Sequence, residues 1–171
     1  MISAAELARL WELHSTGLES LARTRCNVAE DCVQEAFVRL SLQEVVPDDA
    51  LAWLVKVVRN LAISELRSDQ RRRSREMLSS CERLTRHRTQ QDKDIESISS
   101  EALQQALELL DPAMREIVVA HVWSDMSFRQ IASAFEISPA MAHRRYVEAL
   151  EQLNAGLGAK LDRHNRMKSP K

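Results

Sequence analysis

The chain is patterned as a series of amphipathic helices. Apolar residues recur three and four positions apart through most of the first 73 residues, which is the periodicity of a helix that buries one face. The pattern predicts a first helix with the capping box Ser3-x-x-Glu6, a second that opens at Asn27, and a long third helix from Ala50 to about Arg73. These three helices can pack on one another as a single bundle.

A second helical unit follows a polar stretch. Residues 74–100 carry too little apolar surface to fold alone, so we interpret them as a linker. Helix start signals recur from residue 101 to 155, at Asp111 before Pro112, at Ser127, and at Ser138 before another proline. Residues 156–171 form a polar, basic tail. The predicted fold is therefore all-α, with two small helical domains, 1–73 and 101–155, joined by a linker.

Composition agrees with a helical fold and narrows the setting. Only 3 Gly and 4 Pro occur in 171 residues, and 44% of the residues are apolar. No apolar run reaches the roughly 18 residues that span a bilayer, and the N-terminus lacks the pattern of a signal peptide, so we expect no membrane insertion. Cys26, Cys32 and Cys81 form no C-x-x-C pair, so we expect a reducing cytoplasm, without a disulfide framework or a zinc site.

Positive charge is concentrated in one segment. The net charge of the whole chain is −1, which is mild evidence against a free-standing DNA-binding protein. From Lys56 to Arg75, however, there are seven basic and two acidic residues. A basic patch in a near-neutral chain predicts one DNA-facing surface, with other surfaces that contact protein.

The segment from Ser127 to Leu153 has the organisation of a helix-turn-helix: a helix of about eight residues, a tight turn and a longer helix. Ala132 is small enough for two helices to cross, and Ile137 is the expected apolar plug in the turn. The start of the second helix would then enter the major groove. The predicted contacts with bases and phosphates are Arg129, Ser138, Ala140, His143, Arg144 and Arg145. A plain helical hairpin is the alternative.

Two further helix faces carry polar side chains away from the predicted core. The third helix would offer DNA a set suited to phosphates and to an extruded base, namely Lys56, Arg59, Asn60, Ile63 and Arg67. The second helix presents a set more typical of protein docking, namely Asp31, Gln34, Glu35 and Val38. An ordinary solvated helix face is the alternative in both cases.

No motif for catalysis or for a cofactor is found in the sequence. There is no Gly-rich phosphate loop, no H-E-x-x-H and no Cys/His spacing typical of a metal site. His14, His121 and His143 are far apart in the sequence and lack obvious carboxylate partners, and we expect the first two to lie in helices near a core. We therefore expect no enzyme activity, no metal and no cofactor.

Three segments together resemble the two-domain sigma factors of the extracytoplasmic-function (ECF) group, within the sigma-70 family of RNA polymerase sigma factors. Residues 29–40, AEDCVQEAFVRL, are similar to that group's A-E-D-x-x-Q-E-x-F-x-x-L helix, and residues 52–67, AWLVKVVRNLAISELR, to its W-L-x-x-x-A-R-N-x-A-x-D-x-x-R stretch. L-D-P at 110–112, R-E at 115–116, S-F-x-x-I-A at 127–132 and I-S at 137–138 resemble its C-terminal domain. The resemblance covers about residues 5–73 and 100–153.

The resemblance implies a cytoplasmic, monomeric, alternative sigma factor of bacteria, which binds core RNA polymerase and directs promoter recognition, DNA melting and initiation at a specific gene set. The second-helix face would dock on the polymerase clamp, and the third-helix face would engage the −10 promoter element. The loop from Gln43 to Asp49 would receive a flipped base, and the helix-turn-helix would read the −35 element. An anti-sigma factor commonly accompanies members of the group, so such a partner stays open.

The chain departs from the family pattern at several positions. Ser64 stands where Asp is usual, Val58 where Ala is usual, and Glu148 where Arg is frequent. Glu136 occupies the turn position where Gly is usual, because φ is often positive there. The run M-A-H at 141–143 replaces a more usual T-V-K, so that Ala142 is smaller than expected.

These departures leave two other functions open. A free-standing repressor or activator would use the helix-turn-helix as a dimer and leave the second-helix face unused. A helical adaptor would dock on polymerase without reading a promoter. Substitution of Arg59 and Asn60 by Ala distinguishes the adaptor, which would be unaffected, from a sigma factor, which would lose activity.

Overall fold

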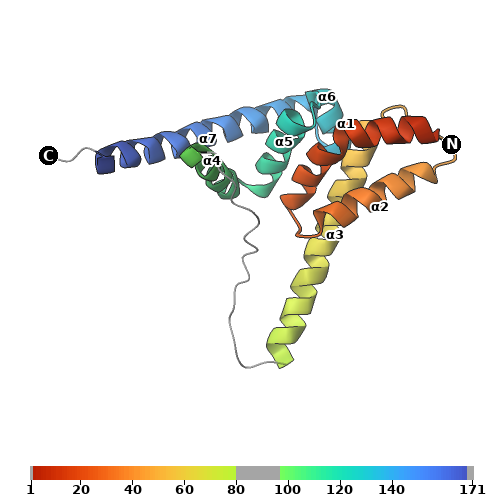
Figure 1. Cartoon of the computed structure of the whole chain (residues 1–171), viewed down its shortest axis with the longest axis horizontal. Helices are drawn as coiled ribbons and strands as arrows, with labels where there is room; N and C mark the ends of the chain where they lie inside the picture. The colour runs from red at the N-terminus through yellow and green to blue at the C-terminus, as the bar shows by residue number, and fades with distance from the viewer. Residues whose placement is uncertain (1, 80–96, 169–171) are drawn as a thin grey trace.

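The computed structural model describes residues 2–79 and 97–168, and within these ranges the chain forms seven α-helices and no strand (Figure 1). Side chains are described for residues 2–75 and 103–156. The helices are α1 (Ala4–Arg23), α2 (Ala29–Ser41), α3 (Ala50–Ser79), α4 (Ser97–Leu109), α5 (Pro112–Trp123), α6 (Phe128–Phe135) and α7 (Pro139–Lys168). We refer to α1–α3 as the N-terminal half and to α4–α7 as the C-terminal half.

Side-chain caps fix most of the helix starts that the sequence predicts. Ser3 accepts a hydrogen bond from the backbone N–H of Glu6, and the Asp49 carboxylate accepts one from the N–H of Ala52. The prediction that Asn27 opens the second helix is wrong. Val28 holds the cap position of α2 and makes no side-chain cap, so the start of α2 depends on tertiary packing rather than on a local hydrogen bond.

The C-terminal half begins its helices with the predicted signals. Asp111 caps α5 with Pro112 at the first turn. Ser127 opens α6 in a reciprocal capping box with Gln130, and the Ser138 hydroxyl accepts from the N–H of Met141 at the start of α7. The helix-turn-helix is therefore formed by α6 and α7.

Two helices are longer than the sequence predicts. α3 was expected to end near Arg73 and continues to Ser79, and α7 continues through the predicted tail to Lys168. No proline interrupts either extension, and Gly156 and Gly158 within α7 each cost only about 1 kcal/mol relative to Ala. Residues 80–96, most of the predicted linker and including Cys81, lie outside the described residues.

One core joins the two halves, whereas the sequence suggested two separate domains. Leu18, Leu21 and Leu54 of the N-terminal half belong to the same buried cluster as Ile117 and Ile131 of the C-terminal half. In this arrangement α1 packs against α5, and α3 packs against α6, as Figure 1 shows. A smaller cluster of Ala106, Leu110, Val118, Ala149 and Leu153 holds α4, α5 and α7 together.

The two ends of α3 have different surroundings. Its first half contributes Leu54, Val55 and Val58 to the core, and Ala62 is its last buried residue up to Arg75. Beyond Ala62 the helix projects away from both halves (Figure 1). Within the described residues, no helix has a stretch of the length and apolar character needed to cross a membrane.

Candidate functional site

The acidic face of α2 is exposed. Cys32, Val33, Ala36 and Phe37 turn toward the core, which leaves the opposite side of the helix open to solvent. That side carries the predicted docking residues, which we call the α2 face: Asp31, Gln34, Glu35 and Val38.

The polar contacts of the α2 face stay within the helix. Gln34 donates to Glu30 at 3.1 Å, and Arg39 pairs with Glu35 at 2.8 Å. Val38 is 52% exposed, an apolar side chain next to this acidic row. The α2 face thus keeps both carboxylates and an apolar contact available to a partner.

The predicted DNA residues of α3 are split by their surroundings. We call Lys56, Arg59, Asn60, Ile63 and Arg67 the α3 face. Asn60 and Arg67 are exposed, and Ile63 is half-buried. Lys56 and Arg59 instead contact the C-terminal half, so the expectation of one continuous open surface needs correction.

The two α3 cations are held by carboxylates of the C-terminal half. The Lys56 ammonium pairs with Glu136 at 2.8 Å, and Arg59 Nε donates to Glu116 Oε2 at 3.2 Å. The Arg59 guanidinium also lies over the Phe135 ring, 4.9 Å from its centroid, which is a cation–π geometry. Its side chain is only 24% exposed.

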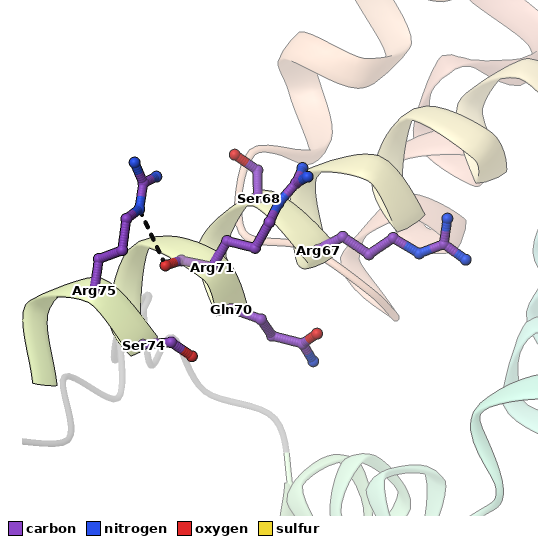
Figure 2. A pocket seen from close by; sticks show the side chains of 6 residues that line it. All are labelled: Arg67, Ser68, Gln70, Arg71, Ser74 and Arg75. Atoms are coloured by element: carbon purple, nitrogen blue, oxygen red, sulfur yellow. Dashed lines mark hydrogen bonds between the residues drawn. The ribbon is translucent and has the colours of Figure 1, made fainter. Parts of the chain in front are cut away.

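The projecting part of α3 carries a basic, polar hollow (Figure 2). Its lining comes from successive turns of this one helix: Arg67, Ser68, Gln70, Arg71, Ser74 and Arg75. Arg75 Nε donates to the backbone carbonyl of Arg71 at 3.3 Å. Guanidinium groups next to hydroxyl and amide groups suit the phosphate backbone of a nucleic acid. The hollow continues the α3 face beyond Arg67.

The helix-turn-helix has the expected internal packing. Ala132 and Ala142 are buried, and Ile137 packs against the core from the turn. Glu136 ends α6 in the left-handed conformation, with φ 57° and ψ 42°, as the comparison with the usual Gly predicts. The neighbouring Lys56 lowers the pKa of this carboxyl, so the Glu136 side chain is ionised.

The predicted −35 residues cluster on the outer side of α6 and α7, which we call the recognition face. Exposed members are Arg129, Ser138, Ala140, His143 and Arg144, whereas Arg145 is half-buried. The His143 ring meets the edge of Phe128 at 5.0 Å. Glu148, which the sequence placed near DNA, lies 3.8 Å from the Arg144 guanidinium and offsets part of its positive charge.

Sequence reasoning missed the buried carboxylate of Glu116. This residue is fully buried in α5, and Arg25 donates to it through Nε at 2.7 Å and through Nη2 at 3.1 Å. Together with Arg59, these residues form what we call the Glu116 bridge. The available signal was a lone acid directly before the apolar run of residues 117–120.

The histidines and cysteines show no arrangement for metal chemistry in the described ranges, where no group of three or more potential ligands occurs. His121 lies near the core as expected, with Nδ1 2.7 Å from the carbonyl of Met126. The Cys26 and Cys32 sulfurs are 3.8 Å apart. Burial raises the pKa of Cys26 and raises that of Cys32 to about 12, so both remain weakly reactive thiols.

Comparison with known solved structures supports the fold. The chain is similar to the sigma factor RpoE from Bartonella quintana, solved with the anti-sigma factor NepR, with 21% identity and a TM-score of 0.65 over 91% of this chain and 98% of that one. It is also similar to CnrH, solved with the cytosolic domain of CnrY, with 23% identity and a TM-score of 0.62 over 92% of this chain and 90% of that one. A search of curated protein sequences gives no significant match.

Two sequence families match the chain in the order that the resemblance implied. Sigma-70 region 2 matches residues 10–72, and Sigma-70 region 4 matches residues 100–153, which together make up about two thirds of the chain. The first match contains α2 and the core-forming part of α3, and the second contains the helix-turn-helix. The chain therefore belongs to the sigma-70 family: it is an alternative sigma factor with the paired regions 2 and 4 of the ECF group, and it directs promoter-specific initiation of transcription.

Proposed function

We propose that the three faces described above divide the work of this sigma factor. The α2 face binds core RNA polymerase, the α3 face engages and opens the −10 element, and the recognition face binds the −35 element. The observation that carries the proposal is the separation of charge: the carboxylates of α2 and the cations of α3 lie on different helices. The polymerase does the chemistry of RNA synthesis, and the chain itself catalyses nothing.

The α2 face has the properties of a protein interface. Its acidic groups make only exposed, intrahelical contacts, which are weak and easily exchanged for a partner's cations. Val38 adds apolar area next to them, which association would remove from water. A basic partner surface therefore gains ion pairs here without disrupting the core of this chain.

The α3 face and the basic hollow supply contacts for the −10 region. Asn60 presents an exposed amide that can read a base edge, and Ile63 offers an apolar contact next to it. Arg67 and Arg71 continue the same helix with guanidinium groups for phosphates. Separated strands expose both phosphates and bases, so this set is suited to single-stranded DNA.

The recognition face supplies the −35 contacts. The exposed start of α7 places Ser138, Ala140 and His143 where a recognition helix meets base edges. Arg129 and Arg145 flank it and fit phosphates, which fix register rather than sequence. The Arg144–Glu148 contact reduces the net positive charge on this face and hence its general attraction for DNA.

Transcription from a pool of fragments of the source genome tests the proposal. Purified core polymerase is assayed with and without the chain, and the new transcripts are expected to share one sequence upstream of their starts. Asp31→Lys combined with Glu35→Lys should abolish them, since like charges across an interface cost several kcal/mol. Core binding without transcripts would favour the adaptor, and absence of core binding would refute the proposal.

A matched control separates docking from general effects of charge. Glu12→Lys combined with Glu19→Lys makes the same change in charge on α1, outside the α2 face, and should leave transcription intact. Substitution of Arg59 and Asn60 by Ala should abolish promoter-directed transcripts while core binding persists. Unchanged transcription by that variant would contradict the assignment of the α3 face to the −10 element.

The cellular setting and the partners of this chain are part of the same proposal. Both solved relatives were captured with a second protein, which their descriptions give as the anti-sigma factor NepR and as CnrY. We infer that this chain acts in the bacterial cytoplasm as a monomer and is a target for an anti-sigma factor. Copurification of a small, separately encoded protein that blocks the transcripts would support this inference.

A further inference from the structure

The Glu116 carboxylate is the one fully buried acid among the residues whose side chains are described. Both of its oxygens are used: Oε1 accepts from Arg25, and Oε2 accepts from Arg25 and Arg59. Arg25 follows α1, Arg59 belongs to α3, and Glu116 belongs to α5. The bridge therefore ties the N-terminal half to the C-terminal half around one charge that water cannot reach.

A buried carboxylate with two guanidinium partners commits those partners. Removing either arginine would leave charge on Glu116 poorly compensated in a water-excluded site, which is costly. The hydrogen bond from Glu116 also raises the pKa of Arg25, which reflects how strongly the pair favours its charged form. Arg59 is therefore not available to another anion while the halves remain in contact.

The same interface holds a second cation of the α3 face. Lys56 pairs with Glu136 at the turn of the helix-turn-helix, and Gln130 of α6 donates to Asp49 at 3.0 Å, just before α3. The recognition face remains exposed in this arrangement. Contact between the halves thus occupies the cations assigned to the −10 element and leaves the −35 residues open.

A close backbone approach makes the contact specific. Gly17 of α1 faces the end of α5, and a Cβ atom at this position would lie 2.5 Å from the carbonyl oxygen of Trp123 and 2.7 Å from Ser124 Oγ. No residue other than glycine fits there without a shift, because the nearest atom belongs to the backbone. Gly17 and the Glu116 bridge hold α1 and α5 together by independent means, one steric and one electrostatic.

We propose that the free chain inhibits its own −10 surface: the Glu116 bridge and the Gly17 contact hold the C-terminal half against α3, so that Arg59 and Lys56 reach DNA only after the halves separate. The inference rests on the proposed role of the α3 face. Docking on polymerase would supply the separation, and DNA phosphates would then replace Glu116 and Glu136 as partners of the two cations.

Two variants release the contact by different routes. Glu116→Gln keeps the shape of the side chain and removes its charge, and Gly17→Ala inserts a methyl group against the Trp123 carbonyl. Alanine also favours helix within α1, so the N-terminal half should keep its fold. Neither residue belongs to the faces assigned to polymerase or DNA, so both variants should support wild-type transcription with core polymerase.

Solution scattering of the full chain and anisotropy of a labelled, random-sequence single-stranded 20-mer form the test. Both variants should show a larger radius of gyration and bind the DNA at least about fivefold more tightly than wild type, within the usual range of coupling between sites. Arg59→Ala in either background should remove most of that gain. Glu19→Gln, which changes the same charge in an exposed pair, and Gly156→Ala, which has no atom within 4 Å of its Cβ position, should match wild type.

Three results would overturn the inference. One is wild-type dimensions in both variants, and another is expansion without tighter DNA binding. The third is loss of transcription by both variants despite core binding, because Glu116 and Gly17 would then belong to the working form. Failure of the wild-type chain to support transcription would count against the proposed function instead, whatever the scattering shows.

Discussion

The α2 face and the α3 face are both charged sides of neighbouring helices, yet their charges are held in different ways. On α2, Glu35 pairs with Arg39 one turn away, and both side chains are about half exposed. On α3, Arg59 pairs with a carboxylate that is 57 residues distant and 1% exposed. Exposed intrahelical pairs can be exchanged for a partner at little cost, whereas a buried pair between halves must be broken. We therefore expect α2 to be ready for its partner and α3 to need release.

The largest expected effect breaks the comparison at the Glu116 bridge. Arg25→Ala removes two of the three hydrogen bonds to the buried carboxylate and should lower the free energy of unfolding by about 3 kcal/mol. Arg39→Ala on α2 removes an exposed pair and should cost about 0.5 kcal/mol or less. Urea denaturation of both variants measures the difference, and equal losses would contradict the distinction between the two faces.

The next effect concerns the projecting part of α3. Arg67→Gln combined with Arg71→Gln should weaken promoter binding by the assembled polymerase complex and reduce the slope of log K against log salt by about 1.8, since each lost phosphate contact on duplex DNA contributes about 0.9. Arg9→Gln combined with Arg23→Gln removes the same charge from α1 as a control. An unchanged slope for the α3 variant would show that the basic hollow does not meet phosphates.

A smaller effect is expected at the turn between α6 and α7. Glu136→Gly relieves the left-handed conformation and loses only an exposed pair with Lys56, so it should raise the free energy of unfolding by about 1 kcal/mol. Ser133→Gly, at an exposed position inside α6, should have the opposite sign. Thermal unfolding measures both variants, and destabilisation by Glu136→Gly would mean that the Lys56 contact outweighs the backbone strain.

The smallest effect is a dependence on pH through His14. Burial lowers the pKa of this histidine below its usual 6.5, and Asp125 opposes the shift in part. As pH falls below about 6.5, the unfolded chain takes up the proton more readily, so the free energy of unfolding falls until the lowered pKa is passed. Denaturation at about pH 7.5 and about pH 5.5 should show this loss, and His14→Gln should reduce it. An equal loss in that variant would assign it to other groups.

The sequence predicts best what is local. Ser3, Asp49, Asp111, Ser127 and Ser138 each cap a helix as expected, because the donor and the acceptor lie within three residues of each other. Asn27 has the same preference but lies one residue too early, because packing sets the start of α2. The left-handed turn was likewise predictable from the family pattern, since Glu136 stands where Gly is usual.

Contacts between distant segments could not be predicted. Arg25 and Glu116 are 91 residues apart, and nothing near either residue marks the other as its partner. The division into two domains therefore suggested open faces on α3, whereas the packing of α5 and α6 covers part of them. The residue-level roles of the three faces, and the boundaries of the domains, remain predictions from pattern and from family resemblance.

Hydrogen exchange of the free chain and of its complex with core polymerase tests the central contrast most directly. The account predicts that amides of α2, residues 29–41, become more protected in the complex, while those of α5 and of the facing part of α3 become less protected as the halves separate. Unchanged exchange of α2, or increased protection at the contact between α3 and α5, would contradict a sigma factor that docks through α2 and releases α3.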